Sequence, residues 1–305
     1  MNILVIGSGG REHSIVYALS KSTVLKNLYA SPGNPGIFQI AKNPNINTQD
    51  FGSVVNFCKN HSIDLVVIGP EQPLEKGLSD ELSEYGINVF GPTKSAAQLE
   101  TSKIFAKEFM KRHNIPTAKF EYFELKNRVQ AHDYIDNQPL PIVLKADGLA
   151  AGKGVIIADN YNDAHKILDL MFQGLFKEAS SRVVIEEFLE GEEASILAIT
   201  DGNDFITLAP SQDHKRALDN DEGKNTGGMG SYSPAPIISE TLLEEIKDTI
   251  IKPTIDGMSA EGNKFVGCLY AGLMISEGKP YVIEFNVRFG DPETQSVLHI
   301  FNGDF

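Results

Sequence analysis

The sequence predicts an α/β domain built on a parallel sheet, followed by a larger α+β domain. The chain has 305 residues, about twice the length of a common single domain. Over the first third of the chain, short apolar runs alternate with helical patterns, and each run ends in a turn containing Gly or Pro. From about residue 103 the strands are mostly hairpin-linked with flanking helices, which is typical of an α+β arrangement. We therefore expect domains at 1–102 and 103–305.

Composition and charge restrict the classes of function. Apolar residues make up 41% and charged residues 22% of the chain, which is ordinary for a globular protein. No apolar run reaches the roughly 18 residues of a membrane helix, and the first residues lack the features of a secretory signal. With 27 Lys and Arg against 41 Asp and Glu, the net charge of −14 disfavours nucleic-acid binding. The two cysteines fit a reduced, cytoplasmic protein better than a disulfide framework.

The elements of the first domain alternate simply. Strands are expected over NILVIG, NLYA, DLVVIG and NVF, with helices extending to about residue 21, over 52–61 and before the fourth strand. Because these strands are short, apolar and separated by helices, we expect them to be parallel. Ligands of such sheets bind at the carboxyl ends of the strands, where this sequence has the turns GSGG, SPGNPG, GPEQP and GPT.

The second domain is expected to begin with a helix over KIFAKEFMKRH. Further helices are expected near 128–136, 161–172 and 239–258, between strands such as KFEYFEL, RVVIEE, FVGCLYAGLMI and PYVIEFNV. The segment PIVLKADGLAAGKGVIIA indicates two strands joined by a Gly-rich loop. The last helix, expected to open at Asp291-Pro292, is short and has no obvious partner, from which we expect a C-terminal portion to be missing.

The first Gly-rich turn, residues 7–12, is compatible with phosphate binding. It does not complete a dinucleotide-binding signature, because Glu12 replaces the third glycine and Ser31-Pro32-Gly33 stand where a ribose-binding acid belongs. What remains is a strand-to-helix turn whose free backbone N–H groups would form a general anion site. A tight turn without a ligand is the alternative.

A second Gly-rich loop, residues 147–154, resembles a P-loop but is one residue short and lacks the hydroxyl of that motif. Since it joins two strands, a flap that closes over a triphosphate suits it better, and an idle hairpin tip is the alternative. Lys145, on the preceding strand, is expected to face inward. A buried lysine requires an anionic partner, for which phosphate is a candidate.

Two further segments carry candidate ligands. Residues 186–193 (EEFLEGEE) are either a solvated acidic turn or a segment that binds a purine through its backbone and a ribose through a carboxylate. On PYVIEFNV, alternation places Glu284 and Asn286 on one face, with Arg288 following. Paired oxygen ligands suit Mg²⁺, and an outward polar stripe is the alternative. The segment from Asp213 to Gly230 is expected to be long and irregular, which favours a functional role, but we assign it no metal site.

Taken together, several segments resemble the phosphoribosylamine–glycine ligase family of the ATP-grasp superfamily: GSGGREH, SPGN, GPEQPL, TSKIFAKEFM, KADGLAAGKGV, EEFLEGEEAS, DHKR…NTGGMG…SPAP and EFNVRFGDPETQ. The likeness spans essentially the whole chain. It implies a Rossmann-like N-terminal substrate-phosphate domain, an ATP-grasp domain with a lid subdomain at about 118–190, and a family C-terminal domain that is expected to be missing here. The implied activity is ATP-dependent joining of glycine to 5-phosphoribosylamine through a glycyl phosphate, in purine synthesis, with ATP and Mg²⁺ (or Mn²⁺) as cofactors.

The resemblance also implies roles for individual residues. Catalytic roles would fall to Lys145, Asp213 and Arg288. ATP would be bound by Lys103, Lys145, Gly152, Lys153, Gly154, Glu186, Glu187, Phe188, Leu189 and Glu193. The sugar phosphate would lie at Gly9 and Gly10, with Glu71 on the sugar hydroxyls, while Asp213 and Arg288 would take the ammonium and carboxylate of glycine. Glu284 and Asn286 would hold Mg²⁺. We expect a monomer or weak oligomer that acts on small molecules and has no nucleic-acid or membrane partner.

Two alternatives to this activity stay open. One is another ATP-grasp ligase that uses formate or bicarbonate in place of glycine. The other is a nucleotide-binding module that holds ATP and Mg²⁺ without turnover. A dehydrogenase is disfavoured by Glu12 and by the missing acid after the second strand.

Overall fold

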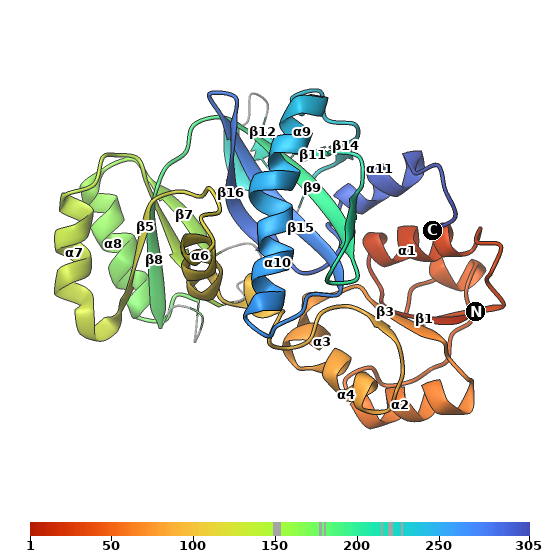
Figure 1. Cartoon of the computed structure of the whole chain (residues 1–305). Helices are drawn as coiled ribbons and strands as arrows, with labels where there is room; N and C mark the ends of the chain where they lie inside the picture. The colour runs from red at the N-terminus through yellow and green to blue at the C-terminus, as the bar shows by residue number, and fades with distance from the viewer. Residues whose placement is uncertain (149–153, 177–178, 180, 215, 219–221, 227) are drawn as a thin grey trace.

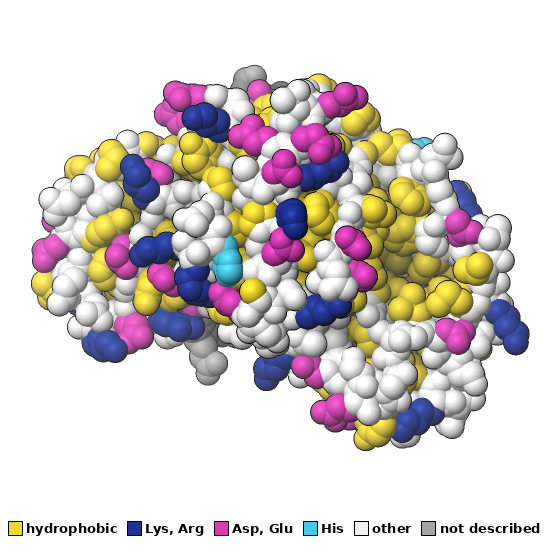
Figure 2. All heavy atoms as spheres, viewed as in Figure 1, with side chains coloured by type: hydrophobic (Ala, Val, Ile, Leu, Met, Phe, Trp, Pro, Cys, Tyr) yellow, Lys and Arg dark blue, Asp and Glu magenta, His cyan; other side chains and the backbone are white. Residues whose placement is uncertain are grey.

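The computed structural model describes the whole chain except residues 149–153, 177–178, 180, 215, 219–221 and 227. The described strands form three four-stranded sheets and two two-stranded ladders. Figure 1 shows the N-terminal sheet at one end of the molecule, the sheet containing β5 and β8 at the other, and the sheet containing β9, β15 and β16 between them. On the face seen in Figure 2, acidic and basic side chains are interspersed.

The N-terminal sheet is parallel throughout, with the strand order β2-β1-β3-β4. Its central strand β1 is buried from Ile3 onward, as expected for a strand that helices cover on both faces. The prediction of parallel strands whose turns meet at one edge is confirmed. The elements are β1 (Asn2–Gly7), α1 (Gly10–Leu19), β2 (Asn27–Pro32), η1 (Ile37–Gln39), α2 (Phe51–Asn60), β3 (Leu65–Ile68), α3 (Glu71–Glu75), α4 (Leu78–Glu84) and β4 (Val89–Phe90).

The second sheet is antiparallel, with the order β5-β8-β6-β7, and α7 and α8 pack against it (Figure 1). Side chains of both helices and of three strands share one apolar core. As predicted, β6 and β7 are antiparallel neighbours joined by the Gly-rich loop. The elements from the end of the first sheet onward are α5 (Gln98–Thr101), α6 (Lys103–Arg112), β5 (Phe120–Glu124), η2 (Leu125–Asn127), α7 (Arg128–Asp136), β6 (Ile142–Ala146), β7 (Val155–Ala158), α8 (Tyr161–Phe172) and β8 (Arg182–Glu187).

The third sheet, β10-β9-β15-β16, is also antiparallel, and β15 is buried along most of its length. The helix predicted near 239–258 forms with a π-helical turn in its middle. Pro253 explains the turn, because it has no N–H to donate to the carbonyl four residues earlier. The elements are β9 (Glu192–Thr200), β10 (Phe205–Thr207), α9 (Glu240–Ile246), η5 (Lys247–Ile251), α10 (Lys252–Ala260), β15 (Gly267–Ser276) and β16 (Lys279–Asn286).

A β-bulge interrupts the pairing of β15 with β16. Gly272 pairs with Glu284, whereas Leu273 pairs with Val282, so Ile283 is an extra residue in β16. Side chains three positions apart on a regular strand point to opposite faces. Because of the bulge, Val282 and Phe285 are nevertheless both buried. Glu284 is left on the exposed side of the strand.

The segment from Asp213 to Gly230 is only partly irregular, so that prediction is wrong in part. Here β11 (Gln212–Asp213) pairs with β14 (Ser231–Tyr232) and β12 (Arg216–Leu218) pairs with β13 (Glu222–Asn225), whereas Thr226 and residues 228–230 lie in no strand. These strands are too short and too polar to show an alternating apolar pattern. They can be recognised only from the backbone pairing in the structure.

The expectation that the last helix lacks a partner is also wrong. Helix α11 (Glu293–Ile300) packs against α1, and Val297 and Leu298 share an apolar core with Ile15 and Val16. The partner comes from the opposite end of the sequence, so no local pattern could reveal it. The helix begins after Pro292, and Asp291 accepts a hydrogen bond from the side chain of Gln295 rather than capping the backbone.

Candidate functional site

A buried lysine–carboxylate pair lies where the second sheet meets the third. Lys145 on β6 is 5% exposed, and its Nζ lies 2.8 Å from Glu186 Oε2. It also donates to the carbonyl of Ile283, the extra residue of the β16 bulge, at 3.2 Å. The predicted inward-facing lysine is therefore confirmed, and its anionic partner in this structure is a carboxylate. The bulge supplies the carbonyl that ties β6 to β16.

A second buried lysine, Lys107 on α6, contacts the same carboxylate oxygen. Its Nζ lies 3.0 Å from Glu186 Oε2 and 2.8 Å from Thr117 Oγ1. Burial lowers the pKa of Lys107 to about 8. Burial alone would raise the pKa of Glu186, but Lys107 and Lys145 outweigh it and hold that pKa below its usual value. Lys107 was not among the predicted site residues, because a lysine in an amphipathic helix has the sequence pattern of a solvated residue.

The other carboxylate oxygen of Glu186 is unusual. Glu186 is 3% exposed, and its Oε1 has no hydrogen-bond partner among the described residues. A buried acceptor left without a donor is costly. One acceptor oxygen of this lysine–carboxylate cluster is therefore left without a hydrogen-bond donor among the described residues.

Lys103 is placed at the same junction by Asp147. Ser102 caps α6, and the Asp147 carboxylate accepts from the Ile104 N–H at 2.9 Å and from the Ser102 hydroxyl at 3.0 Å. Lys103 Nζ donates to the carbonyl of Gly148 at 3.3 Å, and burial lowers the pKa of Lys103. Asp147 was not predicted. It follows β6 directly, and it couples the start of the Gly-rich loop to the start of α6.

Three of the predicted nucleotide residues belong to that loop. The Gly154 carbonyl accepts from the Ala146 N–H at 2.8 Å, which closes the base of the hairpin. Gly152 and Lys153 lie outside the described residues.

The predicted purine segment connects β8 to β9, and hence the second sheet to the third. The Glu187 N–H donates to the Lys119 carbonyl at 3.0 Å, and its carboxylate accepts from the Lys119 N–H at 2.8 Å. Phe188 and Leu189 are partly exposed in the connection, and Glu193 is exposed on β9. The segment is thus not merely a solvated turn, because Glu187 ties β8 to the residue just before β5.

Glu284 and Asn286 lie on one face of β16, as predicted, with the Glu284 side exposed. The part of the chain that the structure describes contains no cluster of three or more His, Cys, Asp or Glu placed to hold a metal. Two oxygen donors fit Mg²⁺, which commonly uses one or two protein oxygens together with water and phosphate oxygens. They do not fit a structural zinc site, which requires four protein ligands.

Arg288 connects the N-terminal domain to the third sheet. Its Nε donates to Glu71 Oε2 at 3.0 Å, and its Nη2 lies 2.9 Å from Glu100 Oε1. Glu100 also accepts from the Val287 N–H at 2.8 Å. Burial raises the pKa of Glu100, whereas for Glu71 the Arg288 guanidinium outweighs burial and lowers the pKa. The structure therefore brings two predicted substrate residues, Glu71 and Arg288, together, and adds Glu100.

The turn before α1 differs from its prediction. The Gly9 N–H donates to Glu12 Oε2 at 2.6 Å, so this N–H is not free in this structure. Glu12 in turn accepts from Arg11 at 2.6 Å, and Arg11 also donates to the Phe289 carbonyl. A Cβ on Gly10 would lie 2.9 Å from Gln295 Nε2. Gly10 therefore faces the last helix at close range, and the turn is closed by its own glutamate.

Asp213 lies in β11, opposite Ser231. The preceding residue, Gln212, donates from its side chain to the backbone carbonyl of Glu193 at 3.0 Å. The small ladder that carries Asp213 is thereby attached to the strand that carries Glu193.

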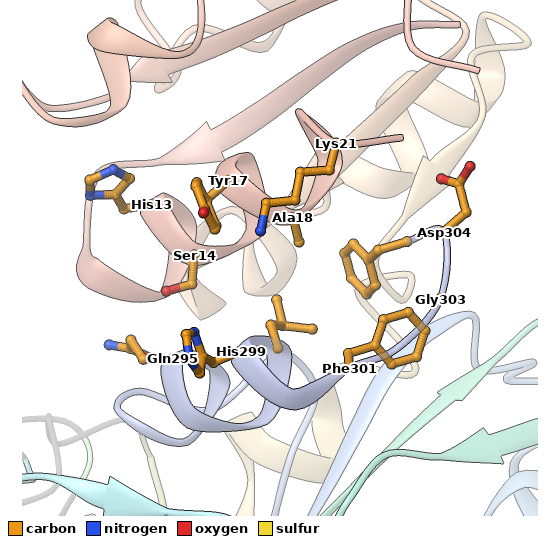
Figure 3. Close-up of a pocket in the computed structure, with 12 residues that line it drawn as sticks. His13, Ser14, Tyr17, Ala18, Lys21, Gln295, His299, Phe301, Gly303 and Asp304 are labelled. Atoms are coloured by element: carbon orange, nitrogen blue, oxygen red, sulfur yellow. The ribbon is translucent and has the colours of Figure 1, made fainter. Parts of the chain in front are cut away.

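A cavity of about 280 Å³ lies between α1 and α11, and its lining does not include Lys103, Lys107 or Lys145. Figure 3 shows His13, Tyr17 and Lys21 on the α1 side, facing Gln295 and His299 on the α11 side. Because Gln295 also neighbours Gly10, the cavity adjoins the first Gly-rich turn. No residue lining this cavity was among the predicted site residues.

The comparisons with known proteins cover both domains. Residues 1–100 match the N domain of phosphoribosylglycinamide synthetase, and residues 101–294 match its ATP-grasp (A) domain. The chain belongs to the phosphoribosylglycinamide synthetase family. The phosphoribosylamine–glycine ligase of Neisseria meningitidis serogroup B is 50% identical over 306 residues, which cover 100% of this chain and 72% of that protein. The ligase of Agrobacterium fabrum is 50% identical over 98% of this chain and 70% of its own length.

Solved structures agree with this family. The crystal structure of phosphoribosylamine–glycine ligase from Thermotoga maritima has a TM-score of 0.85 and 37% identity, and the match covers 98% of this chain and 72% of that chain. A biotin carboxylase domain from Hydrogenobacter thermophilus matches at a TM-score of 0.75 with 16% identity, which shows a shared fold alone. The predicted order of a Rossmann-like parallel sheet followed by an ATP-grasp domain is confirmed. No helix in the described ranges is long and apolar enough to cross a membrane.

Proposed function

We propose that this protein joins glycine to 5-phosphoribosylamine at the expense of ATP, giving glycinamide ribonucleotide, ADP and phosphate. The observation that carries the proposal is the buried junction of Lys145, Glu186 and Lys103 beside Glu284, in a chain of this family. Buried and half-buried ammonium groups next to the exposed Glu284 carboxylate suit a triphosphate with its metal ion. Relatives 50% identical to this chain carry the name phosphoribosylamine–glycine ligase.

In the proposed nucleotide site, Lys103 and Lys145 bind the phosphates, and residues 186–189 contact adenine, with Glu193 on the ribose. Glu186 Oε1, an acceptor without a partner among the described residues, favours adenine over guanine as the base. The exocyclic amine of adenine donates to a carboxylate, whereas the guanine carbonyl at that position would repel it. Gly152, Lys153 and Gly154 complete the site as part of the flap.

Glu284 and Asn286 would hold Mg²⁺, or Mn²⁺, as the cofactor. When bound, the ion neutralises charge on the phosphates. The chain's own residues then orient the reactants. Phosphoryl transfer depends mainly on charge and positioning, so lysines and an arginine suffice without a dedicated base.

Asp213 would take the ammonium of glycine and Arg288 its carboxylate, while Gly9, Gly10 and Glu71 would hold the sugar and its phosphate. The phosphate would have to replace Glu12 Oε2 at the Gly9 N–H. A carboxylate oxygen of glycine attacks the γ-phosphorus and ADP leaves. The amine of the sugar then attacks the acyl carbon, the carbon–oxygen bond to phosphate breaks, and the nitrogen loses a proton. Because Arg288 is bound by Glu71 and Glu100 in this structure, glycine would replace one of these contacts.

The remaining assignments follow from the same proposal. Residues 1–102 would be the sugar-phosphate domain and residues 103–305 the ATP-grasp domain, with a lid at about 118–190. The protein would be cytoplasmic, as a monomer or weak oligomer, with small-molecule substrates only.

The test is ADP release measured with 5-phosphoribosylamine and glycine, formate or bicarbonate in turn. Glycine labelled with ¹⁸O in its carboxylate also tests for the intermediate, because one labelled oxygen must appear in inorganic phosphate if a glycyl phosphate forms. Faster turnover with formate or bicarbonate would assign the protein to another ligase of this superfamily. Binding of MgATP without turnover on any acid would leave only a nucleotide-binding module.

A further inference from the structure

Lys107 is a buried cation to which the proposed chemistry gives no role. It is 2% exposed and lies one helical turn after Lys103 on α6, so the two lysines share a helix face. The groups that face its ammonium are Glu186 and Thr117 in direct contact, Lys145 and Glu187 through their charges, and the ring of Phe120, whose centre is 5.7 Å away. Burying an ammonium is expensive, so its retention at this position calls for an explanation.

The explanation lies in how charge is shared. Glu186 Oε2 is the common partner of Lys107 at 3.0 Å and Lys145 at 2.8 Å. Two ammonium groups and one carboxylate leave one positive charge in excess. With Lys107 removed, Glu186 and Lys145 would form a neutral pair, and the carboxylate would compete with an incoming phosphate for the Lys145 ammonium.

We propose that Lys107 is a positioning residue of the nucleotide site, which holds the Glu186 carboxylate so that Lys145 can direct its charge to the triphosphate. This inference rests on the proposed function, in which Lys145 binds the phosphates. Thr117 fixes the geometry, because its hydroxyl both contacts Lys107 and donates to the Val282 carbonyl at 2.7 Å. The chain of contacts therefore runs from α6 to the bulged strand β16.

The primary experiment measures the affinity for MgADP, which needs no turnover. Lys107→Met should raise the Kd by at least about 30-fold, the lower range of the effect of removing one partner of a buried charge pair. Lys111→Met, an exposed position on the same helix, is the matched control and should leave the Kd unchanged. Circular dichroism and the thermal midpoint establish that each variant is folded.

The pH dependence of binding separates positioning from a merely structural role. In the unmodified protein, MgADP affinity should fall as the pH rises through about 8, where Lys107 loses its proton. The Lys107→Met variant should show no such fall. The pH titration of the unmodified protein needs no variant to fold.

The outcomes are distinct. If Lys107→Met binds MgADP as tightly as the unmodified protein, or if its affinity retains the fall near pH 8, the inference is overturned. If Lys145→Met is weakened while Lys107→Met is not, only the positioning role fails. If neither is weakened, the proposed nucleotide site itself is wrong.

Discussion

Replacing Lys145 with methionine tests the nucleotide site most directly. Methionine keeps an unbranched side chain of similar volume and removes the charge. Since Lys145 is 5% exposed and lies 2.8 Å from Glu186, solvent screens its charge little. Losing one desolvated partner of the triphosphate should cost about 2–5 kcal/mol, which corresponds to a rise of about 30-fold to 5,000-fold in the Kd for MgADP. Isothermal titration calorimetry measures this range.

The matched control for Lys145→Met is Lys166→Met, on a helix that packs against the sheet containing Lys145. Lys166 lies on α8, its side chain is 64% exposed, and its closest acid is Asp163 at 3.7 Å. Lys166→Met should leave MgADP affinity unchanged, because an exposed pair of this kind contributes little. Folding of Lys145→Met should be largely preserved, since Glu186 keeps Lys107 as a partner. A folded Lys145→Met protein with unchanged affinity would refute the assignment of the site.

Three other changes probe the rest of the structure. Glu284→Gln should raise the Mg²⁺ concentration required for half-maximal activity by about tenfold or more, measured at fixed ATP, and an unchanged requirement would remove Glu284 from the metal site. Burial raises the pKa of Glu100, so as the pH falls this carboxyl takes up a proton sooner than an ordinary one and releases Arg288. The carboxylate of glycine then no longer competes with Glu100 for Arg288, so the KM for glycine should fall on acidification, and Glu100→Gln should show the low KM at every pH; parallel profiles for the two proteins would contradict this. Leu298→Ala should lower the free energy of unfolding by about 2–4 kcal/mol, against little change for the exposed His299→Ala, as measured by urea denaturation.

Local patterns were enough to predict most helices and strands. The helices expected near 128–136 and 161–172 coincide with α7 and α8. Helix α8 has a clear apolar stripe and an Asn160 cap, and α7 buries Ala131 and Ile135, four positions apart, on one face. The parallel arrangement of the first sheet followed from short apolar strands separated by helices. Its order, β2-β1-β3-β4, did not, since pairing between strands depends on packing that no single segment encodes.

The candidate site was predictable only in part. Lys145 was identified as buried from its place on an apolar strand, and Glu284 with Asn286 from alternation. Lys107 and Glu100 were missed because their partners, Glu186 and Arg288, lie far away in the sequence. A charged residue in an amphipathic helix carries no local sign that it will be buried. Most individual roles came from the family resemblance and not from the residue pattern.

The extra residue in β16 has a consequence for how this strand can vary. In an uninterrupted strand Val282, Glu284 and Asn286 would all point to the same side, and a core-facing valine would force the two oxygen ligands into the core. The extra residue Ile283 shifts the alternation of side chains by one position. Val282 can therefore point into the core while Glu284 and Asn286 point to the other side of the strand. Shortening the strand by that single position would exchange inside for outside in one of the halves, with every side chain still present.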